Sequence, residues 1–119
     1  MIIGIGTDLT EKERVKKACD KDAFLSYVFT EAEIELIKKK KDSAAGNWAV
    51  KEAVVKAMGT GFSGMKIKEI EVLRDELGKP YVKLYGKALE KQKELGIERF
   101  FVSISDTKEY TSAVAVAEG

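Results

Sequence analysis

The 119-residue sequence contains no histidine, one cysteine and one proline. Without histidine, the chain cannot build a Ser-His-Asp or Cys-His catalytic site or a histidine-ligated zinc site. The single cysteine, Cys19, cannot form an internal disulfide, and no metal-ligand spacing surrounds it. We interpret Cys19 as a small buried side chain near a helix end. Catalysis, if present, therefore depends on carboxylates, lysines, hydroxyls, backbone groups and a hard metal ion.

Long apolar runs and an excess of one charge are also missing. No run approaches the ~20 residues of a membrane span, and the apolar residues 1–6 are too short for a secretory signal. The chain carries 21 basic and 20 acidic residues, without the strongly basic character of a nucleic-acid-binding domain. We expect one soluble, cytoplasmic domain over residues 1–119, with no membrane and no nucleic-acid partner.

The hydrophobic pattern predicts an α+β fold with a mainly antiparallel sheet packed on one long and several short helices. Strands are expected at residues 2–9, 68–74, 81–85, 100–105 and 111–117, and helices at 11–18, 22–27, 31–41, 44–58 and 86–95. The last two strands form a hairpin around Lys108 and Glu109, and a turn at residues 75–80 joins the second and third strands. Strands that pair as hairpins favour the α+β class.

Several polar residues stand where helices are expected to begin. Thr10 with Glu13, and Thr30 with Glu33, have the spacing of a capping box, in which each side chain bonds a free backbone N–H. Ser43 precedes the alanine-rich helix and is expected to be its N-cap. These residues predict the starts of three helices.

The first strand carries Asp8 on the same face as Gly4 and Gly6. Two glycines remove side chains from that face, so another group can approach it closely. A carboxylate beside such a cleared surface is a candidate ligand. The alternative is an ordinary exposed aspartate at a strand end.

The alanine-rich helix carries Trp48, Glu52 and Lys56, each four residues from the next and therefore on one side. The simplest reading is an exposed Glu52–Lys56 ion pair. The aromatic neighbour suggests instead that the carboxylate is partly buried, where desolvation makes an ion pair costly without a further reason.

The loop after this helix contains Gly59, Thr60, Gly61 and Gly64. Glycine amides can approach an anion closely, but the loop lacks the lysine and spacing of a Walker motif. A helix stop followed by a flexible loop is the alternative. With Asp8 and Glu52 as carboxylates, Mg²⁺ completed by a substrate pyrophosphate is the metal that fits. Lys56 would then contact a phosphate oxygen.

Three segments in this order resemble the holo-acyl-carrier-protein synthases, the small bacterial branch of the 4′-phosphopantetheinyl transferases. They are GIGTD at residues 4–8 with Glu11 and Arg14, WAVKEAVVKAMGTG at residues 48–61, and VSISDTKEY at residues 102–110. The intervening GKPY at residues 78–81 also fits. The likeness covers essentially the whole chain, and the second segment is the most specific.

The resemblance implies the fold of that family and a role for each matching residue. Asp8 and Glu52 would ligate Mg²⁺, and Lys56 would contact the transferred phosphate. The residues implied to line the coenzyme A nucleotide are Gly59, Thr60, Gly61, Pro80, Asp106 and Thr107. Arg14 would contact the acidic acyl carrier protein. The family also implies a homotrimer with its sites between subunits.

Two positions depart from the family pattern. Asp106 stands where the family usually has a histidine near the 3′-phosphate of coenzyme A, and Asn47 stands where a basic residue is common. An ionised aspartate cannot donate a hydrogen bond and would repel a phosphate. Two outcomes follow: nucleotide binding is weaker, or lysines 39–41 compensate.

The expected reaction is attack of a carrier-protein serine on the phosphate that bears the pantetheine arm, with adenosine 3′,5′-bisphosphate leaving. Positioning and charge neutralisation would supply most of the catalysis. Glu52, a water on the metal and Lys56 are the candidate bases. Two alternatives are a binding module for coenzyme A or carrier protein that has lost transfer activity, and a Mg²⁺-dependent nucleotide pyrophosphatase.

Overall fold

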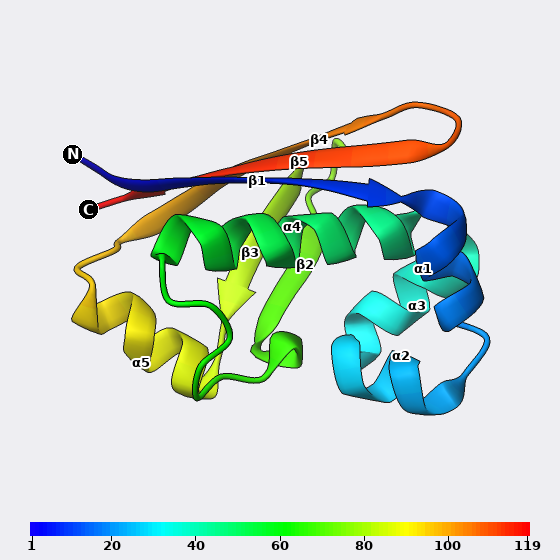
Figure 1. The fold of residues 1–119 in the computed structure, drawn as a ribbon, viewed down its shortest axis with the longest axis horizontal. Coiled ribbons are helices and arrows are strands. Elements are labelled where there is room, and N and C mark those ends of the chain that lie inside the picture. The colour runs from blue at the N-terminus through cyan, green and yellow to red at the C-terminus, as the bar shows by residue number, and fades with distance from the viewer.

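The computed structural model describes residues 1–119, and every predicted helix and strand is present in it (Figure 1). The α+β class with antiparallel sheets is confirmed. The elements are β1 (Ile2–Glu11), α1 (Lys12–Ala18), α2 (Asp22–Val28), α3 (Glu31–Lys39), α4 (Ser43–Met58), the 3₁₀ turn η1 (Ile67–Glu69), β2 (Ile70–Arg74), β3 (Pro80–Leu84), α5 (Gly86–Glu94), β4 (Arg99–Asp106) and β5 (Tyr110–Glu118).

The larger sheet has the order β1-β5-β4, and both pairs are antiparallel. β5 lies between the first and the penultimate strand, so residues from the two ends of the sequence pair, as in Ile5 with Val116 and Asp8 with Ala113. β2 and β3 form a separate antiparallel hairpin. No helix is both long enough and apolar enough to cross a lipid bilayer.

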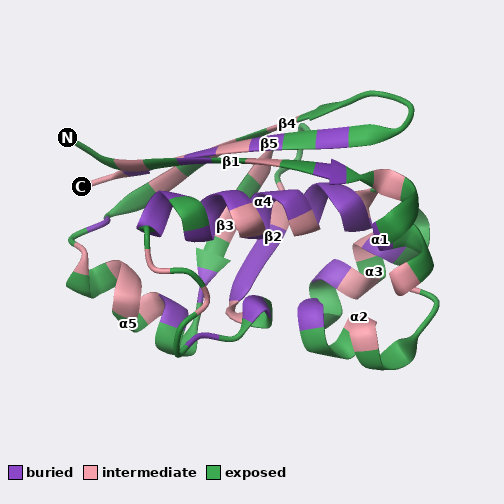
Figure 2. Cartoon of the chain, in the orientation of Figure 1, coloured by how far each residue is buried: buried purple, intermediate pink, exposed green.

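Helix α4 lies between the two sheets. In Figure 1 it runs along one face of β1-β5-β4, while β2, β3 and the shorter helices lie on its other side. Twelve of its 16 residues are buried, and Figure 2 shows purple along the whole length of the helix, interrupted by shorter pink and green bands. A helix enclosed on most sides needs small and apolar side chains all round, which explains its five alanines and three valines.

Glycines in β1 let the backbone of α4 pack directly against the backbone of the strand. A Cβ placed on Gly4 would lie 1.9 Å from the carbonyl oxygen of Ala57, and one on Gly6 would lie 1.9 Å from that of Ala53. Real Cβ atoms do not come that close to an oxygen, so only glycine fits. The predicted close approach to the glycine face is confirmed, and the approaching group is the α4 backbone.

Apolar side chains form two clusters around α4. The larger one joins α4 to both sheets and includes Val50, Val54, Ile70 and Val72. The smaller one joins the N-terminal half of α4 to α1, α2 and α3. Cys19 packs against the smaller cluster at the end of α1, where it is half-buried rather than fully buried.

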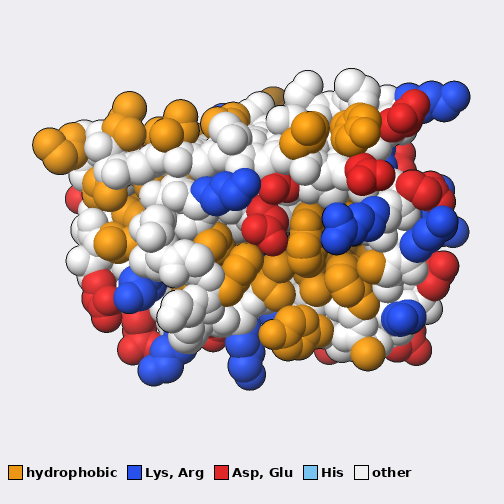
Figure 3. Space-filling model, viewed as in Figure 1, with side chains coloured by type: hydrophobic (Ala, Val, Ile, Leu, Met, Phe, Trp, Pro, Cys, Tyr) orange, Lys and Arg blue, Asp and Glu red, His pale blue; other side chains and the backbone are white.

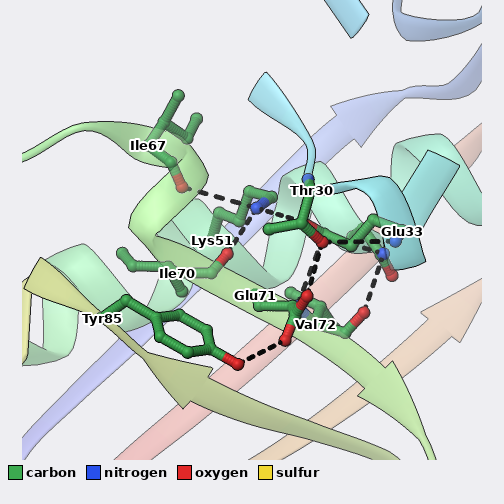
Figure 4. A network of polar contacts seen from close by, with 9 residues as sticks. Thr30, Glu33, Lys51, Ile67, Ile70, Glu71, Val72 and Tyr85 are labelled. Carbon is green, nitrogen blue, oxygen red and sulfur yellow. Dashed lines mark hydrogen bonds and ion pairs between the residues drawn. The ribbon is translucent and has the colours of Figure 1, made fainter. Parts of the chain in front are cut away.

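A charged network lies inside this core, and the sequence analysis missed it (Figure 4). Lys51 and Glu33 are both fully buried, and the Lys51 Nζ lies 2.9 Å from the Glu33 Oε1. Lys51 also donates to the carbonyls of Ile67 and Ile70. Glu33 accepts from the Asn47 side chain at 3.0 Å and from the Val72 backbone N–H at 3.3 Å. The network ties α3, α4 and β2 together.

The helix caps are only partly as predicted. The capping box of Thr30 and Glu33 is present, with both of its hydrogen bonds. The predictions for Thr10 and Ser43 were wrong: Thr10 is the buried penultimate residue of β1, and Ser43 is already inside α4, which begins after Asp42. Neither α1 nor α4 has a side-chain cap. At the start of α1, the Lys12 N–H instead donates to the Glu109 carbonyl of the β4–β5 turn. At the start of α4, the Ser43 and Ala44 N–H groups donate to the Lys40 and Lys41 carbonyls of the preceding turn.

Candidate active site

Asp8 and Glu52 line the same cavity, which has a volume of about 640 Å³. Asp8 comes from the glycine face of β1, and Glu52 comes from the middle of α4. The other lining residues come from the end of β1, α1, α2, α4 and β5: Leu9, Thr10, Glu11, Arg14, Val15, Ala18, Phe24, Trp48 and Tyr110. The backbone contact between β1 and α4 therefore brings two carboxylates together that are 44 residues apart in the sequence.

Asp8 is held by two neighbours, one on each oxygen. The Thr10 hydroxyl donates to its Oδ2 at 2.5 Å, and the Lys56 Nζ lies 3.6 Å from its Oδ1. Lys56 is thus paired with Asp8 across the strand–helix contact, and the simple Glu52–Lys56 ion pair is absent. The Asp8 side chain is 15% exposed and that of Lys56 is 56% exposed, so the ammonium group stays open to solvent and to a ligand.

The pKa of Glu52 is raised above its ordinary value. Burial is the main cause, the negative charge of Asp8 adds to it, and the positive charge of Lys56 opposes it. The negative charge of Asp8 therefore acts on the Glu52 carboxylate. A cation between them would relieve the repulsion.

The donor set fits a hard divalent cation that also takes ligands from elsewhere. No group of three or more aspartate, glutamate, histidine or cysteine side chains gathers anywhere in the chain. The protein therefore lacks an all-protein metal cage. Mg²⁺ is commonly held by one or two carboxylates, with waters and substrate phosphates as the remaining ligands. Asp8 and Glu52 match that pattern.

One wall of the carboxylate cavity is aromatic. The rings of Phe24 and Trp48 stack at 5.9 Å between centroids. These two residues and Glu52 also line a second, apolar cavity of about 320 Å³, together with Tyr27, Val28, Phe62, Met65 and Ile67. In Figure 3 this region is the continuous orange surface that lies beside red and blue groups near the middle of the molecule.

The remaining residues implied by the resemblance fall into separate places. Arg14 lines the carboxylate cavity. Pro80 and Asp106 line a different cavity of about 640 Å³, which also contains Gly46 of α4. Thr107 closes the turn between β4 and β5 by accepting from the Tyr110 N–H at 3.0 Å.

Gly59, Thr60 and Gly61 follow the end of α4 and line none of these cavities. Gly59 has φ 73° and stops the helix in the left-handed conformation, as predicted. Gly46 and Gly59 are 13 residues apart, so about 20 Å of helix separates this loop from the cavity of Pro80 and Asp106. A single chain therefore does not gather all the residues that the resemblance implies for the nucleotide.

Two residues near these sites were not identified from the sequence as functional. We predicted Thr10 to be a helix cap. Residues two apart in a strand lie on the same face, so Thr10 lies beside Asp8 and bonds it. Lys12 lies 3.9 Å from the Asp106 carboxylate and 3.7 Å from that of Asp42, and it donates to the Thr107 carbonyl at 3.1 Å. No sequence signal indicated the contacts of Lys12, because its partners are far away along the chain.

Comparison with known proteins places these features in a family. Residues 4–115 match the model of the 4′-phosphopantetheinyl transferase superfamily, and the chain belongs to that superfamily. A holo-[acyl-carrier-protein] synthase from Lachnoclostridium phytofermentans is 54% identical over 118 residues, which cover 99% of this chain and 97% of the relative.

Solved structures agree over the full length. A Helicobacter pylori holo-[acyl-carrier-protein] synthase in complex with coenzyme A superposes with a TM-score of 0.85 at 30% identity, covering 96% of this chain and 99% of that one. A Bacillus anthracis holo-(acyl-carrier-protein) synthase in complex with CoA (3′,5′-ADP) has a TM-score of 0.80 at 33% identity, covering 99% and 97%.

Proposed function

We propose that this chain, as one domain over residues 1–119, transfers the 4′-phosphopantetheine arm of coenzyme A to a serine of apo acyl carrier protein. The observation that carries the proposal is the pairing of Asp8 and Glu52 in one cavity, with Lys56 beside them, in a member of the transferase superfamily. Relatives named holo-[acyl-carrier-protein] synthase, two of them in complex with coenzyme A, support it.

The protein's own residues would act mainly by positioning and charge. Asp8 and Glu52 would hold Mg²⁺, which supplies positive charge to the pyrophosphate when bound. The Thr10 hydroxyl fixes the Asp8 carboxylate. Lys56, exposed next to Asp8, would neutralise charge on the transferred phosphate.

In the transfer, the serine oxygen forms a bond to the phosphorus that bears the pantetheine arm. The bond from that phosphorus to the bridging oxygen breaks, and adenosine 3′,5′-bisphosphate leaves with the electron pair. The serine proton passes to a base in the cavity. Arg14, on the rim of that cavity, would contact acidic groups of the carrier protein and bring its serine to the carboxylates.

One assay tests the function against its alternatives. The protein is mixed with apo carrier protein, coenzyme A and Mg²⁺, and the carrier is weighed by mass spectrometry. We expect the mass to increase by one phosphopantetheine. Binding of coenzyme A without any gain would indicate a binding module, and nucleotide hydrolysis without carrier modification would indicate a pyrophosphatase.

The variant Glu52→Gln tests the metal pair. It removes a charged ligand and a source of repulsion but keeps the shape of the side chain, so the fold should persist. We expect metal-dependent transfer to fall by at least 100-fold, since oriented charge of this kind supplies factors of about 10²–10³. Circular dichroism should match the wild type. Wild-type transfer rates in this variant would remove Glu52 from the site.

We further propose that the working form is a homotrimer whose sites lie between subunits. The nucleotide residues sit at both ends of α4 within one chain, which favours a second chain completing each site. The outer face of the larger sheet is also apolar and exposed, with Ile5 at 66%, Leu9 at 69% and Phe101 at 51%. Exposed apolar surface of this kind is typical of an interface.

Analytical ultracentrifugation tests the assembly. We expect three chains per particle for the wild type, and dissociation with loss of transfer for Ile5→Glu, which places a charge on the exposed sheet face. Leu77→Glu, in the turn between β2 and β3 and 95% exposed, is the matched control for added charge alone, because it lies outside the larger sheet. A monomeric wild-type protein with full activity would contradict the trimer.

A further inference from the structure

The hydroxyl of Thr10 is bonded directly to one of the two carboxylates of the candidate metal site. It donates to the Asp8 Oδ2 at 2.5 Å, a length typical of a hydrogen bond from a hydroxyl to an ionised carboxylate. Thr10 is buried and lines the same cavity as Asp8 and Glu52. A buried donor at this distance restricts how the Asp8 side chain can lie in the cavity.

The strand β1 presets this hydrogen bond. Thr10 pairs with Thr111 of β5, and Asp8 pairs with β5 two residues further along, so one sheet ladder holds both backbones. Residues two apart in a strand share a face, and a β-branched side chain such as threonine has few rotamers. The terminal torsion of an aspartate is broad by comparison. Thr10 is therefore the stiff partner, and the hydrogen bond fixes the rotation of the Asp8 carboxylate.

The second oxygen of Asp8 is held much less firmly. The Lys56 Nζ lies 3.6 Å from the Asp8 Oδ1, which is too far for a hydrogen bond. The Lys56 side chain is also more than half exposed, whereas that of Asp8 is mostly buried. Thr10 alone therefore orients the carboxylate, and Oδ1 is the oxygen left for a cation.

Mg²⁺ and Ca²⁺ make different demands on a carboxylate. Mg²⁺ requires near-ideal octahedral geometry, whereas Ca²⁺ takes about six to eight oxygens in a flexible arrangement and can bind both oxygens of one carboxylate. A carboxylate has to turn in order to change from binding through one oxygen to binding through two. The hydrogen bond on Oδ2 opposes that turn, so it suits Mg²⁺ better than Ca²⁺.

We propose that Thr10 is a positioning residue whose hydroxyl holds the Asp8 carboxylate in one rotation and thereby raises the affinity of the site for Mg²⁺ relative to Ca²⁺. The inference rests on the proposed function for the identity of the metal. It concerns only this chain's own side chains, and it adds a determinant of metal selectivity that neither carboxylate supplies by itself.

The variant Thr10→Val tests the inference, because valine keeps the shape and the strand preference of threonine but removes the hydroxyl. Mg²⁺ and Ca²⁺ are titrated separately, first without coenzyme A and then with it. Trp48, the only tryptophan of the chain, lines the cavity one helical turn before Glu52, so its fluorescence can report binding. Isothermal titration calorimetry gives the same constants without an optical signal.

We expect Thr10→Val to weaken Mg²⁺ binding by about 10-fold, the lower end of what a residue that orients a metal ligand contributes. Ca²⁺ binding should weaken by less than about 3-fold, because a carboxylate that can turn still serves Ca²⁺. Thr10→Ser retains the hydroxyl and should restore the wild-type ratio of the two affinities. A loss of packing alone would not be rescued in this way.

Thr111→Val is the matched control. Thr111 lies opposite Thr10 on β5, is fully buried, and its hydroxyl has no hydrogen-bond partner. The substitution therefore removes a buried threonine hydroxyl from the same sheet without touching Asp8, and both affinities should stay unchanged. Thr10→Ala carries the test if circular dichroism shows that Thr10→Val does not fold.

An unchanged Mg²⁺ to Ca²⁺ ratio in Thr10→Val would overturn the inference, as would an equal change in Thr111→Val or a wild-type protein that binds neither cation under both conditions. Transfer activity, measured separately by the mass of the carrier protein, distinguishes this failure from failure of the proposed function. Transfer with an unchanged ratio removes the inference alone. A ratio that depends on the Thr10 hydroxyl, without transfer, removes the proposed function alone.

Discussion

The substitution Lys51→Met tests how strongly the buried network supports the fold. Lys51 and Glu33 are fully buried with 2.9 Å between their charged atoms. Methionine keeps most of the volume of lysine but removes the ammonium group. Glu33 would keep its bonds to the Thr30 N–H at 3.1 Å, the Asn47 amide and the Val72 N–H. The negative charge of Glu33 would then have no positively charged partner.

Breaking a buried ion pair by removing one partner costs about 3–5 kcal/mol, because the other charge stays behind in a medium that solvates it poorly. Domains are stable by about 5–15 kcal/mol in total. The substitution should therefore remove between about a fifth and all of the unfolding free energy. Burial already raises the pKa of Glu33, and Lys51 partly offsets this effect.

The loss should depend on pH in a defined direction. Without Lys51, the pKa of Glu33 rises further, so the folded variant binds a proton more readily than the unfolded chain does. A raised carboxyl pKa means that stability falls as pH rises through the interval between the unfolded and folded values. In the wild type, acid protonates Glu33 and leaves the Lys51 ammonium unpaired. The difference between variant and wild type should accordingly be smaller at pH 5 than at pH 8.

Urea denaturation at a fixed protein concentration is the assay, since assembly would make stability depend on concentration. The matched control is Lys38→Met, which breaks an exposed ion pair with Glu35 at 3.8 Å and should cost under about 0.5 kcal/mol. If Lys51→Met costs no more than Lys38→Met, the buried pair does not support the fold as argued.

Three further variants or probes test other parts of the molecule. Gly6→Ala should cost about 3 kcal/mol or more in urea denaturation, because its Cβ would meet the Ala53 carbonyl at 1.9 Å; a loss no larger than that of Thr7→Ala would contradict the close packing. Asp106→His should tighten coenzyme A a few-fold in calorimetry and leave 3′-dephospho-coenzyme A unchanged; equal effects would show that Asp106 does not face the 3′-phosphate. The pKa of Cys19 is raised, mainly by burial, so iodoacetamide should react with it several-fold more slowly than with glutathione at pH 8; an equal rate would contradict this.

Local signals in the sequence predicted the elements well because each depends on neighbouring residues. The capping box at Thr30 and Glu33, the helix stop at Gly59 and the hairpin around Lys108 are all of this kind. The cap predictions at Thr10 and Ser43 were wrong, because contacts with distant parts of the chain determine where β1 ends and where α4 begins. β1 continues through Thr10 to stay paired with β5.

The sequence predicted those parts of the candidate site whose residues lie on one face of a single helix or strand. Gly4, Gly6 and Asp8 share a strand face, and that face does meet α4. The partner of Lys56 was not predictable, because the ion pair joins two elements. The Lys51–Glu33 ion pair was not predictable for the same reason, because it joins α4 to α3 and the two residues have no regular spacing in the sequence. Charges brought together only by the fold need a structure to be recognised.

The pairing of β1 with β5 has a consequence for synthesis on the ribosome. Asp8 is translated 105 residues before Ala113, the residue opposite it, and β5 is the only sheet partner of its strand. Contacts between residues so far apart in sequence form late and slow folding. α4 would be complete long before, with Glu52 already on it. The strand that carries Asp8 can therefore pair, and fix Asp8 beside Glu52, only after β5 has been translated.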